Sequence, residues 1–336
     1  ADLVAQMTLH EKVSQMLSWA PAIERLGIPA YNWWSEGIHG VGRAGTATVF
    51  PQAIGMAAAF DEDMMEQVGN AVGVEARGKY NMCRAHGDRD IFKGLTVWAP
   101  NINIFRDPRW GRGHETYGED PFLTSRLGVR FVEGMQGDDP DYLQAAACAK
   151  HFAVHSGPES DRHHFNAIVS KQDLWETYLP AFRALVKEAG VEAVMGAYNR
   201  TNGEPCCGSK TLLKDILRDK WHFDGHVTSD CWAIKDFHTG HMVTDGPVES
   251  VALAVNNGCD LNCGSAFLHL QEAYEKGLVS EEAITEAVER LMEVRIRLGM
   301  MKDYPSPYED ITYDKVECPE HVKLSVEAAR RSLVLL

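Results

Sequence analysis

The chain lacks the features that mark two large classes of protein. No Lys/Arg-rich run occurs, and 48 acidic residues outweigh 33 basic ones, for a formal net charge of -15. Because binding to nucleic acid requires a basic surface, we expect no nucleic-acid partner. No apolar stretch approaches the roughly 18 residues that a membrane-spanning helix needs, so we expect no membrane partner either.

Cysteine spacing excludes further classes. None of the eight cysteines forms a Cys-x-x-Cys pair, so neither a zinc ribbon nor thioredoxin chemistry is indicated. Cys206-Cys207 and Cys259…Cys263 lie close together without His-rich ligand spacing, and we expect no metal and no cofactor. These residues form disulfides if the protein is exported, or are free buried thiols. The chain opens at Ala1 without a signal peptide, and the compartment stays open between secreted, periplasmic and cytoplasmic.

What is present predicts an α/β protein. With 45% hydrophobic and 24% charged residues, 336 residues suffice for one α/β barrel or two ordinary domains. Apolar runs read as strands and alternate with amphipathic segments, as in βα units around a parallel sheet. The expected strands are 95–100, 145–149, 193–197 and 225–228. The expected helices are 61–80, 121–136, 173–189, 209–220 and 248–256, with a long one from Ser280 toward Gly299.

The character of the chain changes after this last long helix. The segment 304–308 is proline-rich, and Cys318-Pro319 opens a final helix that leads into the apolar run 332–336. An exposed apolar end is a liability, so we expect this run to begin a strand of a following α/β domain. We therefore predict a (β/α)8 TIM-like barrel over 1–303, and a linker with the start of a second domain over 304–336.

Asp230 is the most informative acidic residue. It follows the β-branched pair Val227-Thr228, so it lies where a buried strand gives way to a loop. In an α/β barrel such strand ends form the active site. Taken alone, Asp230 is more readily explained as the cap of the next helix.

Polar groups follow the other expected strands as well. They are Glu36, the segment 101–112, Lys150-His151, Tyr198-Asn199 and Asp260, and the indoles of Trp33, Trp34, Trp98 and Trp232 lie near them in the sequence. Each of these residues also has a purely structural interpretation. Lys150 is then a solvated charge, His151 a core histidine, Tyr198 a packing residue, and Arg112 the partner of Glu115 or Asp120. Their shared position favours a pocket for a polyhydroxyl ligand, with carboxylates and cations for hydroxyl groups and indole faces for a sugar ring.

The motifs resemble those of family-3 glycoside hydrolases, in particular the β-xylosidase and β-glucosidase group. The resemblance covers essentially the whole chain. It rests on the segments 31–40, 50–52, 99–104, 106–112, 115–121, 149–152, 161–163 and 229–230. It implies that Asp230 is the nucleophile and that Glu36, Arg112, Lys150, His151 and Tyr198 line the pocket for the sugar. It also suggests Trp98, Arg162 and Trp232 as pocket residues.

The resemblance implies a retaining exo-β-glycosidase that releases terminal β-1,4-xylosyl residues. Such an enzyme needs an ionised nucleophile and a proton donor about 5–5.5 Å away. We expect Lys150 or Arg162 to keep the pKa of Asp230 low. The donor is not identified in this chain, because in the family it usually comes from a second domain. Three sources of the proton donor are therefore open: a second domain, a second chain, or an Asp161–His163 dyad similar to that of the β-N-acetylglucosaminidases.

Other functions stay open at this stage. Glu36 stands where glucosidases of the family commonly carry Asp, and the longer acid would fill the space of a hexose hydroxymethyl group, which favours xylose. Steric exclusion of one hydroxymethyl group contributes only a few kcal/mol to the discrimination between substrates. A β-glucosidase or an enzyme active on both sugars is therefore the first alternative, and an enzyme active on arabinosides is another. A non-catalytic sugar-binding barrel and a metal-dependent barrel hydrolase are the remaining candidates.

Overall fold

A computed structural model describes residues 1–301 and 303–335, and its centre is a parallel sheet. Within these residues the sheet has the strand order β3-β4-β6-β9, formed by β3 (Thr96–Val97), β4 (Ala146–Phe152), β6 (Ala193–Gly196) and β9 (His226–Ser229). Each strand is wholly buried, as expected of a parallel sheet covered on both faces. The four expected strands are therefore confirmed, with β4 three residues longer at its carboxyl end.

Isolated β-bridges continue the sheet beyond both of its edge strands, β3 and β9. Ser35 pairs with Val97 beside β3, and Thr228 of β9 pairs with Leu261, which precedes a further bridge between Asn262 and Leu17. The backbone of Trp33 then donates to Ser18 at 2.8 Å. The sheet is thus curled, but a complete (β/α)8 barrel with eight regular strands is not confirmed by the described residues.

Two smaller sheets accompany the main one. The strands β1 (Trp19–Ala20) and β2 (Tyr31–Asn32) form an antiparallel pair. A second small sheet has the order β5-β7-β8, from β5 (Asn166–Ala167), β7 (Arg200–Thr201) and β8 (Glu204–Pro205). It joins the loop after β4 to the loop after β6, because β5 and β7 pair in parallel.

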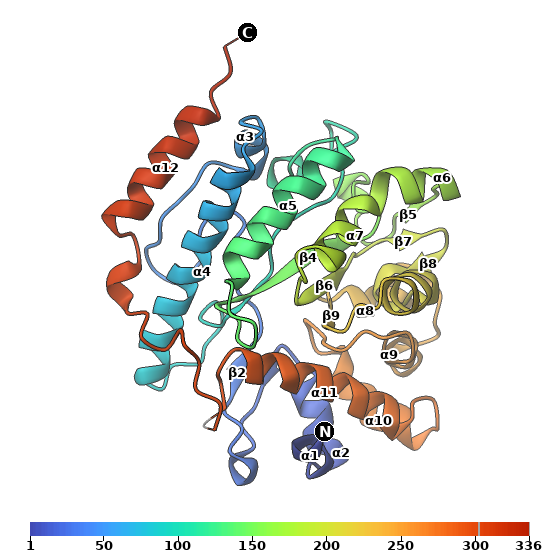
Figure 1. The fold of residues 1–336 in the computed structure, drawn as a ribbon. Coiled ribbons are helices and arrows are strands. Elements are labelled where there is room, and N and C mark those ends of the chain that lie inside the picture. Colours follow the sequence, from blue (N-terminus) through green and yellow to red (C-terminus); the bar gives the residue numbers. More distant parts are fainter. Residues whose placement is uncertain (302, 336) are drawn as a thin grey trace.

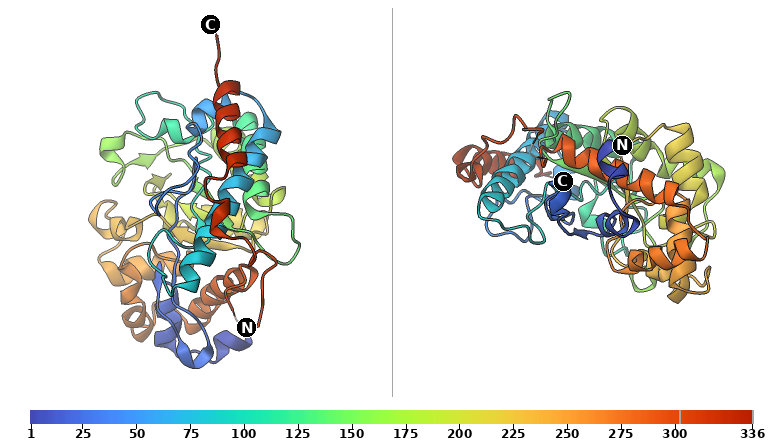
Figure 2. Two further views of the ribbon diagram at one scale, coloured as in Figure 1. Left: turned by 90° about the vertical axis from the view of Figure 1, so that its left-hand side faces the viewer. Right: turned by 90° about the horizontal axis from the view of Figure 1, so that it is seen from below.

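Helices surround the sheet (Figures 1 and 2), and the α-helices of eight or more residues lie where the sequence predicts them. The long helix α4 begins after the capping side chain of Asp61, α5 has Pro121 in its first turn, and Ser280 caps α11. The α-helices are α1 (Asp2–Ala5), α2 (Leu9–Gln15), α3 (Ala53–Ala57), α4 (Glu62–Ala85), α5 (Pro121–Gln136), α6 (Lys171–Asp173), α7 (Pro180–Lys187), α8 (Ala233–Thr239), α9 (Pro247–Asn256), α10 (Leu270–Glu275), α11 (Glu281–Arg297) and α12 (Pro319–Arg331).

The expected helix 173–189 is interrupted. It starts as a π-helix, Leu174–Tyr178, and continues as α7 from Pro180. Proline has no N–H to donate and its ring clashes with the carbonyl four residues before it, so the turn in front of it widens. The amide of Leu179 accordingly bonds the carbonyl of Leu174, five residues back. The expected helix 209–220 is also present, as the π-helix Lys210–Lys220.

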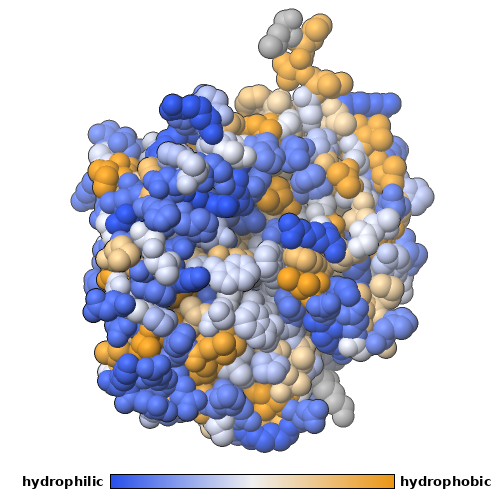
Figure 3. All heavy atoms as spheres, turned by 180° about the vertical axis from the view of Figure 1, so that it is seen from behind, coloured by the Kyte–Doolittle hydropathy of each residue, from blue (hydrophilic) through white to orange (hydrophobic). Residues whose placement is uncertain are grey.

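The last helix is less embedded than the others. It lies along the outer side of α4 (Figures 1 and 2), and Ala328 is its buried residue. The segment that follows projects away from the other helices (Figures 1 and 3). Residues 333–335 adopt neither helix nor strand, so the strand expected at 332–336 is not found there, and Leu336 lies outside the described residues. Of the helices described, none is both long and apolar enough to cross a bilayer.

Candidate active site

Asp230 lies at the carboxyl end of β9 and is nearly buried, with 8% of its surface exposed. Its Oδ1 accepts a hydrogen bond from the backbone N–H of Cys231 at 2.8 Å. Its Oδ2 is buried and has no hydrogen bond of good geometry among the described residues, although the Tyr198 hydroxyl is near enough to the carboxylate to lower the pKa of Asp230. Since buried polar atoms are nearly always paired, this oxygen has capacity for a further partner.

The electrostatic environment of Asp230 differs from the one the sequence suggested. Burial raises the pKa of Asp230, and the positive charges of Arg112 and Lys150, together with the Cys231 amide, offset this only in part. The expectation that neighbouring cations keep this pKa low is therefore wrong. Desolvation outweighs the attraction because the charged form has lost its water.

Lys150 and His151 reach the site from neighbouring positions on β4. In a regular strand, consecutive side chains point to opposite faces. Here the register with β6 shifts between Lys150 and Phe152, and such an irregularity re-aims side chains. As a result Lys150 Nζ lies 3.5 Å from Glu36 Oε2, and His151 Nε2 lies 3.7 Å from Asp230 Oδ2.

Asn103 fixes the tautomer of His151. Its amide nitrogen donates to the backbone carbonyl of His151 at 2.8 Å, so its Oδ1 is the acceptor that faces His151 Nδ1 at 3.0 Å. The proton of the imidazole is therefore on Nδ1, and Nε2 can accept a hydrogen bond. Burial, followed by the nearby charge of Arg112, lowers the pKa of His151 well below its usual value, so the ring is neutral.

Arg112 forms the ion pair with Glu115 that its sequence spacing allowed. Its Nε and a terminal nitrogen bond the two carboxylate oxygens at 2.7 and 2.8 Å, and Asn101 donates to the same carboxylate at 3.2 Å. Although burial raises the pKa of Glu115, the Arg112 pair brings it down to about 2. Glu115 is thus ionised, and Arg112 is held rigidly while its charge also acts on Asp230.

Glu36 is held between two partners. Its Oε1 accepts a hydrogen bond from the Trp34 indole N–H at 2.8 Å, and its Oε2 faces Lys150. Trp34 in turn stacks on Trp98, with ring centroids 5.7 Å apart and planes 19° apart. Trp98 is buried, and its indole nitrogen has no partner among the described residues.

Tyr198 lies next to Asp230, and Arg162 lies beside Tyr198. The Arg162 guanidinium is 5.1 Å from the centre of the Tyr198 ring and 3.3 Å from Glu159. Burial and then the charge of Asp230 raise the pKa of Tyr198, so its hydroxyl stays protonated. The expected Asp161–His163 dyad is not formed: Nδ1 of His163 lies 2.7 Å from Asp236 Oδ2.

Trp232 is exposed beside the nucleophile candidate, at 53%, and its backbone is in the left-handed region with φ 63°. The neighbouring Cys231 forms a disulfide with Cys263, and the Trp232 amide donates to the Cys263 carbonyl at 2.7 Å. The disulfide joins the two strand ends that flank the site. The six other cysteines, including Cys206, Cys207 and Cys259, are free thiols.

Two residues from the expected pocket lie elsewhere. Trp33 is fully buried and packs against Tyr31 and His226 at the start of β9, so it is a core residue. Asp260 is also buried, and it bonds Arg218, Arg290 and the amide of Val227 near the amino end of β9. Its position is at the opposite end of the strand from Asp230, so its placement in the pocket is wrong.

Asn103 lies within the expected segment 101–112 but was not singled out, and the Cys231–Cys263 disulfide was not predicted. The sequence carries a weak signal for Asn103, since Asn-Ile-Asn directly follows an expected strand. Cys231 and Cys263 are 32 residues apart, and only the three-dimensional neighbourhood of β9 and Leu261 brings them together.

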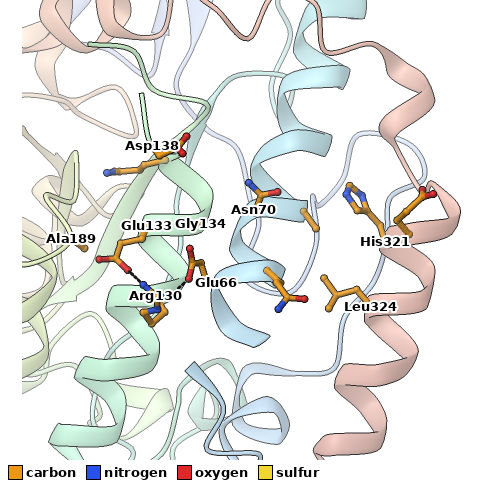
Figure 4. Close-up of a pocket in the computed structure, with 14 residues that line it drawn as sticks. Glu66, Asn70, Arg130, Glu133, Gly134, Asp138, Ala189, His321 and Leu324 are labelled. Atoms are coloured by element: carbon orange, nitrogen blue, oxygen red, sulfur yellow. Dashed lines mark hydrogen bonds and ion pairs between the residues drawn. The ribbon is translucent and has the colours of Figure 1, made fainter. Parts of the chain in front are cut away.

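A cavity of about 700 Å³ between α4, α5 and α12 is separate from this site (Figure 4). Arg130 bonds both Glu66 and Glu133 there, and His321 bonds Glu75. The cavity contains none of the residues gathered around Asp230.

The chain is similar over nearly its whole length to known glycosidases. The chain is 47% identical over 343 residues to xylan 1,4-beta-xylosidase of Xylanibacter ruminicola, which covers all of this chain and 40% of that protein. A solved GH3 exo-beta-xylosidase in complex with a xylobiose aziridine probe superposes with a TM-score of 0.93 at 36% identity, over 99% of this chain and 44% of that one. The beta-glucosidase from Listeria innocua in complex with isofagomine gives 0.86 at 28% identity, over 100% and 51%.

The chain therefore spans between 40% and 51% of the length of these relatives. The model of the glycosyl hydrolase family 3 N terminal domain matches residues 3–294. On this match and these identities, the chain belongs to glycosyl hydrolase family 3.

Proposed function

We propose that the protein is a retaining exo-β-glycosidase that removes non-reducing terminal β-1,4-xylosyl residues. The buried, unpaired Oδ2 of Asp230 carries the proposal, because a carboxylate oxygen without partners in a polar pocket is suited to attack on the anomeric carbon. We also propose that the curled sheet is the wall of a (β/α)8 barrel over 1–303, and that 304–336 leads into a second domain.

The mechanism proceeds in two steps. Asp230 Oδ2 forms a bond to the anomeric carbon while the bond to the leaving oxygen breaks and a general acid protonates that oxygen. Water, deprotonated by the same acid/base group, then attacks the anomeric carbon and releases both the sugar and Asp230. Arg112 and Lys150 supply positive charge that favours the ionised form of Asp230 needed for the first step.

The pocket residues have roles that follow from their protonation. The neutral His151 accepts a hydrogen bond from a sugar hydroxyl through Nε2, since Asn103 fixes its proton on Nδ1. Lys150 donates to a hydroxyl, and Glu36 accepts from one. Trp98, Arg162, Tyr198 and Trp232 complete the pocket, with the exposed Trp232 as a platform for the sugar that leaves.

The proton donor is proposed to come from a second domain or a second chain. Glu115 cannot serve, because its pKa of about 2 keeps it ionised. The relatives extend well beyond the region that matches this chain, which leaves room for such a domain. Activity on β-glucosides is the alternative that the match to the beta-glucosidase from Listeria innocua favours.

Product stereochemistry tests the proposal. Hydrolysis of an aryl β-xyloside, followed by NMR, is expected to release β-xylose first, because two inversions give net retention. Initial release of α-xylose would contradict it. If an activated aryl xyloside is cleaved slowly and azide accelerates the reaction with formation of a β-xylosyl azide, the nucleophile works and the acid is supplied from elsewhere.

A further inference from the structure

A cavity of about 410 Å³ lies between the loops that follow β3 and β4, and its lining residues come from the segments 106–110 and 156–160. We call it the loop cavity. Because β3, β4, β6 and β9 are parallel, their carboxyl ends meet at the end of the sheet that carries Asp230. The loop cavity is therefore at the same end of the molecule as the candidate active site.

Aromatic rings stand between the loop cavity and the Asp230 pocket. Trp110 lines the cavity and meets His155 edge-on, with ring centroids 5.7 Å apart. His155 in turn lies 4.8 Å from the ring of His151, which faces Asp230. A group bound in the loop cavity would thus be different from the one bound at Asp230.

Two buried polar atoms of the lining residues have no hydrogen-bond partner among the described residues. Ser156 is 4% exposed and its hydroxyl is unpaired. Glu159 Oε2 is also buried and unpaired, while Oε1 lies 3.3 Å from Arg162. Buried polar atoms are nearly always paired, and a carboxylate oxygen can only accept. The two atoms are therefore suited to a ligand that carries hydroxyl groups.

One positive charge in the loop cavity is not neutralised by an acidic residue. Arg109 is paired with Asp107, through Nε at 2.9 Å and a terminal nitrogen at 2.6 Å. Arg106 instead donates to the hydroxyl of Tyr178, whose ring centre is 5.4 Å from the guanidinium, and no acidic residue that the structure describes pairs with it. With the carboxylate of Glu159 paired as well, the cavity favours an anion.

We propose that the loop cavity is a second carbohydrate site that binds a uronic acid, with its carboxylate on Arg106 and its hydroxyl groups on Glu159 and Ser156. A carboxylate matches the planar guanidinium, which can donate two parallel hydrogen bonds. The volume falls within the range of small-molecule sites. The inference goes beyond the proposed glycosidase function, because binding in this cavity requires no bond cleavage.

Calorimetric titration of the intact chain tests the proposal, with methyl α-glucuronide and methyl α-glucoside as the two ligands. They differ only at C6, which is a carboxylate in one and a hydroxymethyl group in the other, and a β-glycosidase leaves their α-linkage intact. The glucuronide should bind about tenfold more tightly, as expected for one hydrogen bond to a charged group. Added salt should reduce this difference.

Two cavity variants and one control locate the contacts. Arg106→Gln should raise the Kd of the glucuronide about tenfold and leave that of the glucoside nearly unchanged. Ser156→Ala should raise the Kd of both sugars about threefold, and it decides the question if thermal melting shows that Arg106→Gln does not fold. Arg183→Gln removes the same charge from an exposed position on α7, outside the cavity, and should bind like wild type.

Lys150→Ala distinguishes the loop cavity from the Asp230 pocket. Lys150 belongs to that pocket, so the affinity for the glucuronide should be retained in this variant. Its loss there would place the ligand at Asp230 and overturn the inference. The absence of binding, equal affinities for the two sugars, or an unchanged Kd in either cavity variant would overturn it too. Because the titration does not depend on hydrolysis, it decides the inference even if wild type cleaves no xyloside.

Discussion

Two buried aspartates at opposite ends of β9 show what distinguishes a reactive carboxylate from a structural one. Asp260 has Arg218, Arg290 and the Val227 amide within 2.9 Å, so its oxygens are paired. Asp230 has the Cys231 amide on one oxygen and no hydrogen-bond partner among the described residues on the other. The residue type and the burial are similar, so the difference lies in how far each carboxylate is neutralised.

The same contrast extends to the surroundings. Cations near Asp230 are engaged elsewhere: Arg112 is paired with Glu115, and Lys150 faces Glu36. They act on Asp230 through their charge and leave Oδ2 open. Near Asp260, ion pairs with Arg218 and Arg290 stabilise one end of the sheet. Near Asp230, the Cys231–Cys263 disulfide connects the segments at the other end.

The largest expected effect is on catalysis at Asp230. Asp230→Asn should reduce kcat by on the order of 10⁴-fold or more, because the nucleophile is lost. Its free energy of unfolding at pH 7 should equal or exceed that of wild type. Burial raises the pKa of Asp230, so the folded state loses stability as pH rises through that pKa, and asparagine is free of this effect. Steady-state kinetics and urea unfolding measure both; an active variant would contradict the assignment.

Asp260→Asn should show the reverse pattern. Removing this charge leaves Arg218 and Arg290 without their buried partner, which is expected to lower the free energy of unfolding by on the order of 3 kcal/mol. The folded fraction should retain kcat close to wild type, because Asp260 lies at the far end of β9. A large loss of kcat with full stability would show that the two ends are not distinct.

The disulfide gives an effect of similar size on stability. Cys231→Ser, or reduction of the wild type, should lower the free energy of unfolding by about 3.7 kcal/mol, the loop-closure estimate for a sequence separation of 32. Dithiothreitol should then lower the Tm of wild type but not that of Cys231→Ser. The free thiol Cys259 offers the control, since Cys259→Ser leaves the sensitivity to dithiothreitol in place. Equal Tm values with and without reductant would contradict the prediction.

The smallest effect concerns pH. His155 is buried beside His151, and burial, then the charge of Arg112, lowers its pKa to about 3. The unfolded chain binds a proton near pH 6.5 and the folded chain does not, so stability is full above 6.5 and falls as pH drops toward 3. His155 alone should contribute a loss of about 2 kcal/mol between pH 7 and 5. Urea unfolding of His155→Gln should show a correspondingly smaller loss, and an identical loss would contradict this.

The sequence predicted the elements but not all of their connections. The four strands and the longer helices were found from apolar periodicity and caps, whereas short helices such as α3 and α8 were not, and Asp230 was found from its place after a β-branched strand. The pairing of Cys231 with Cys263 depends on which strands become neighbours, and the pKa of Asp230 depends on desolvation against charge in three dimensions. Trp33 was wrongly expected in the pocket. Side chains alternate between the two faces of an extended segment, so Trp33 points into the core while Trp34 faces Glu36.

Covalent trapping tests the central claim most directly. A 2-deoxy-2-fluoro xyloside with a good leaving group needs no general acid to form the glycosyl-enzyme, so it isolates the nucleophile. Peptide mass mapping should find one fluoroxylosyl group on Asp230 in wild type and in Asp260→Asn, and none in Asp230→Asn. Labelling of any other residue, or labelling that persists in Asp230→Asn, would contradict the account.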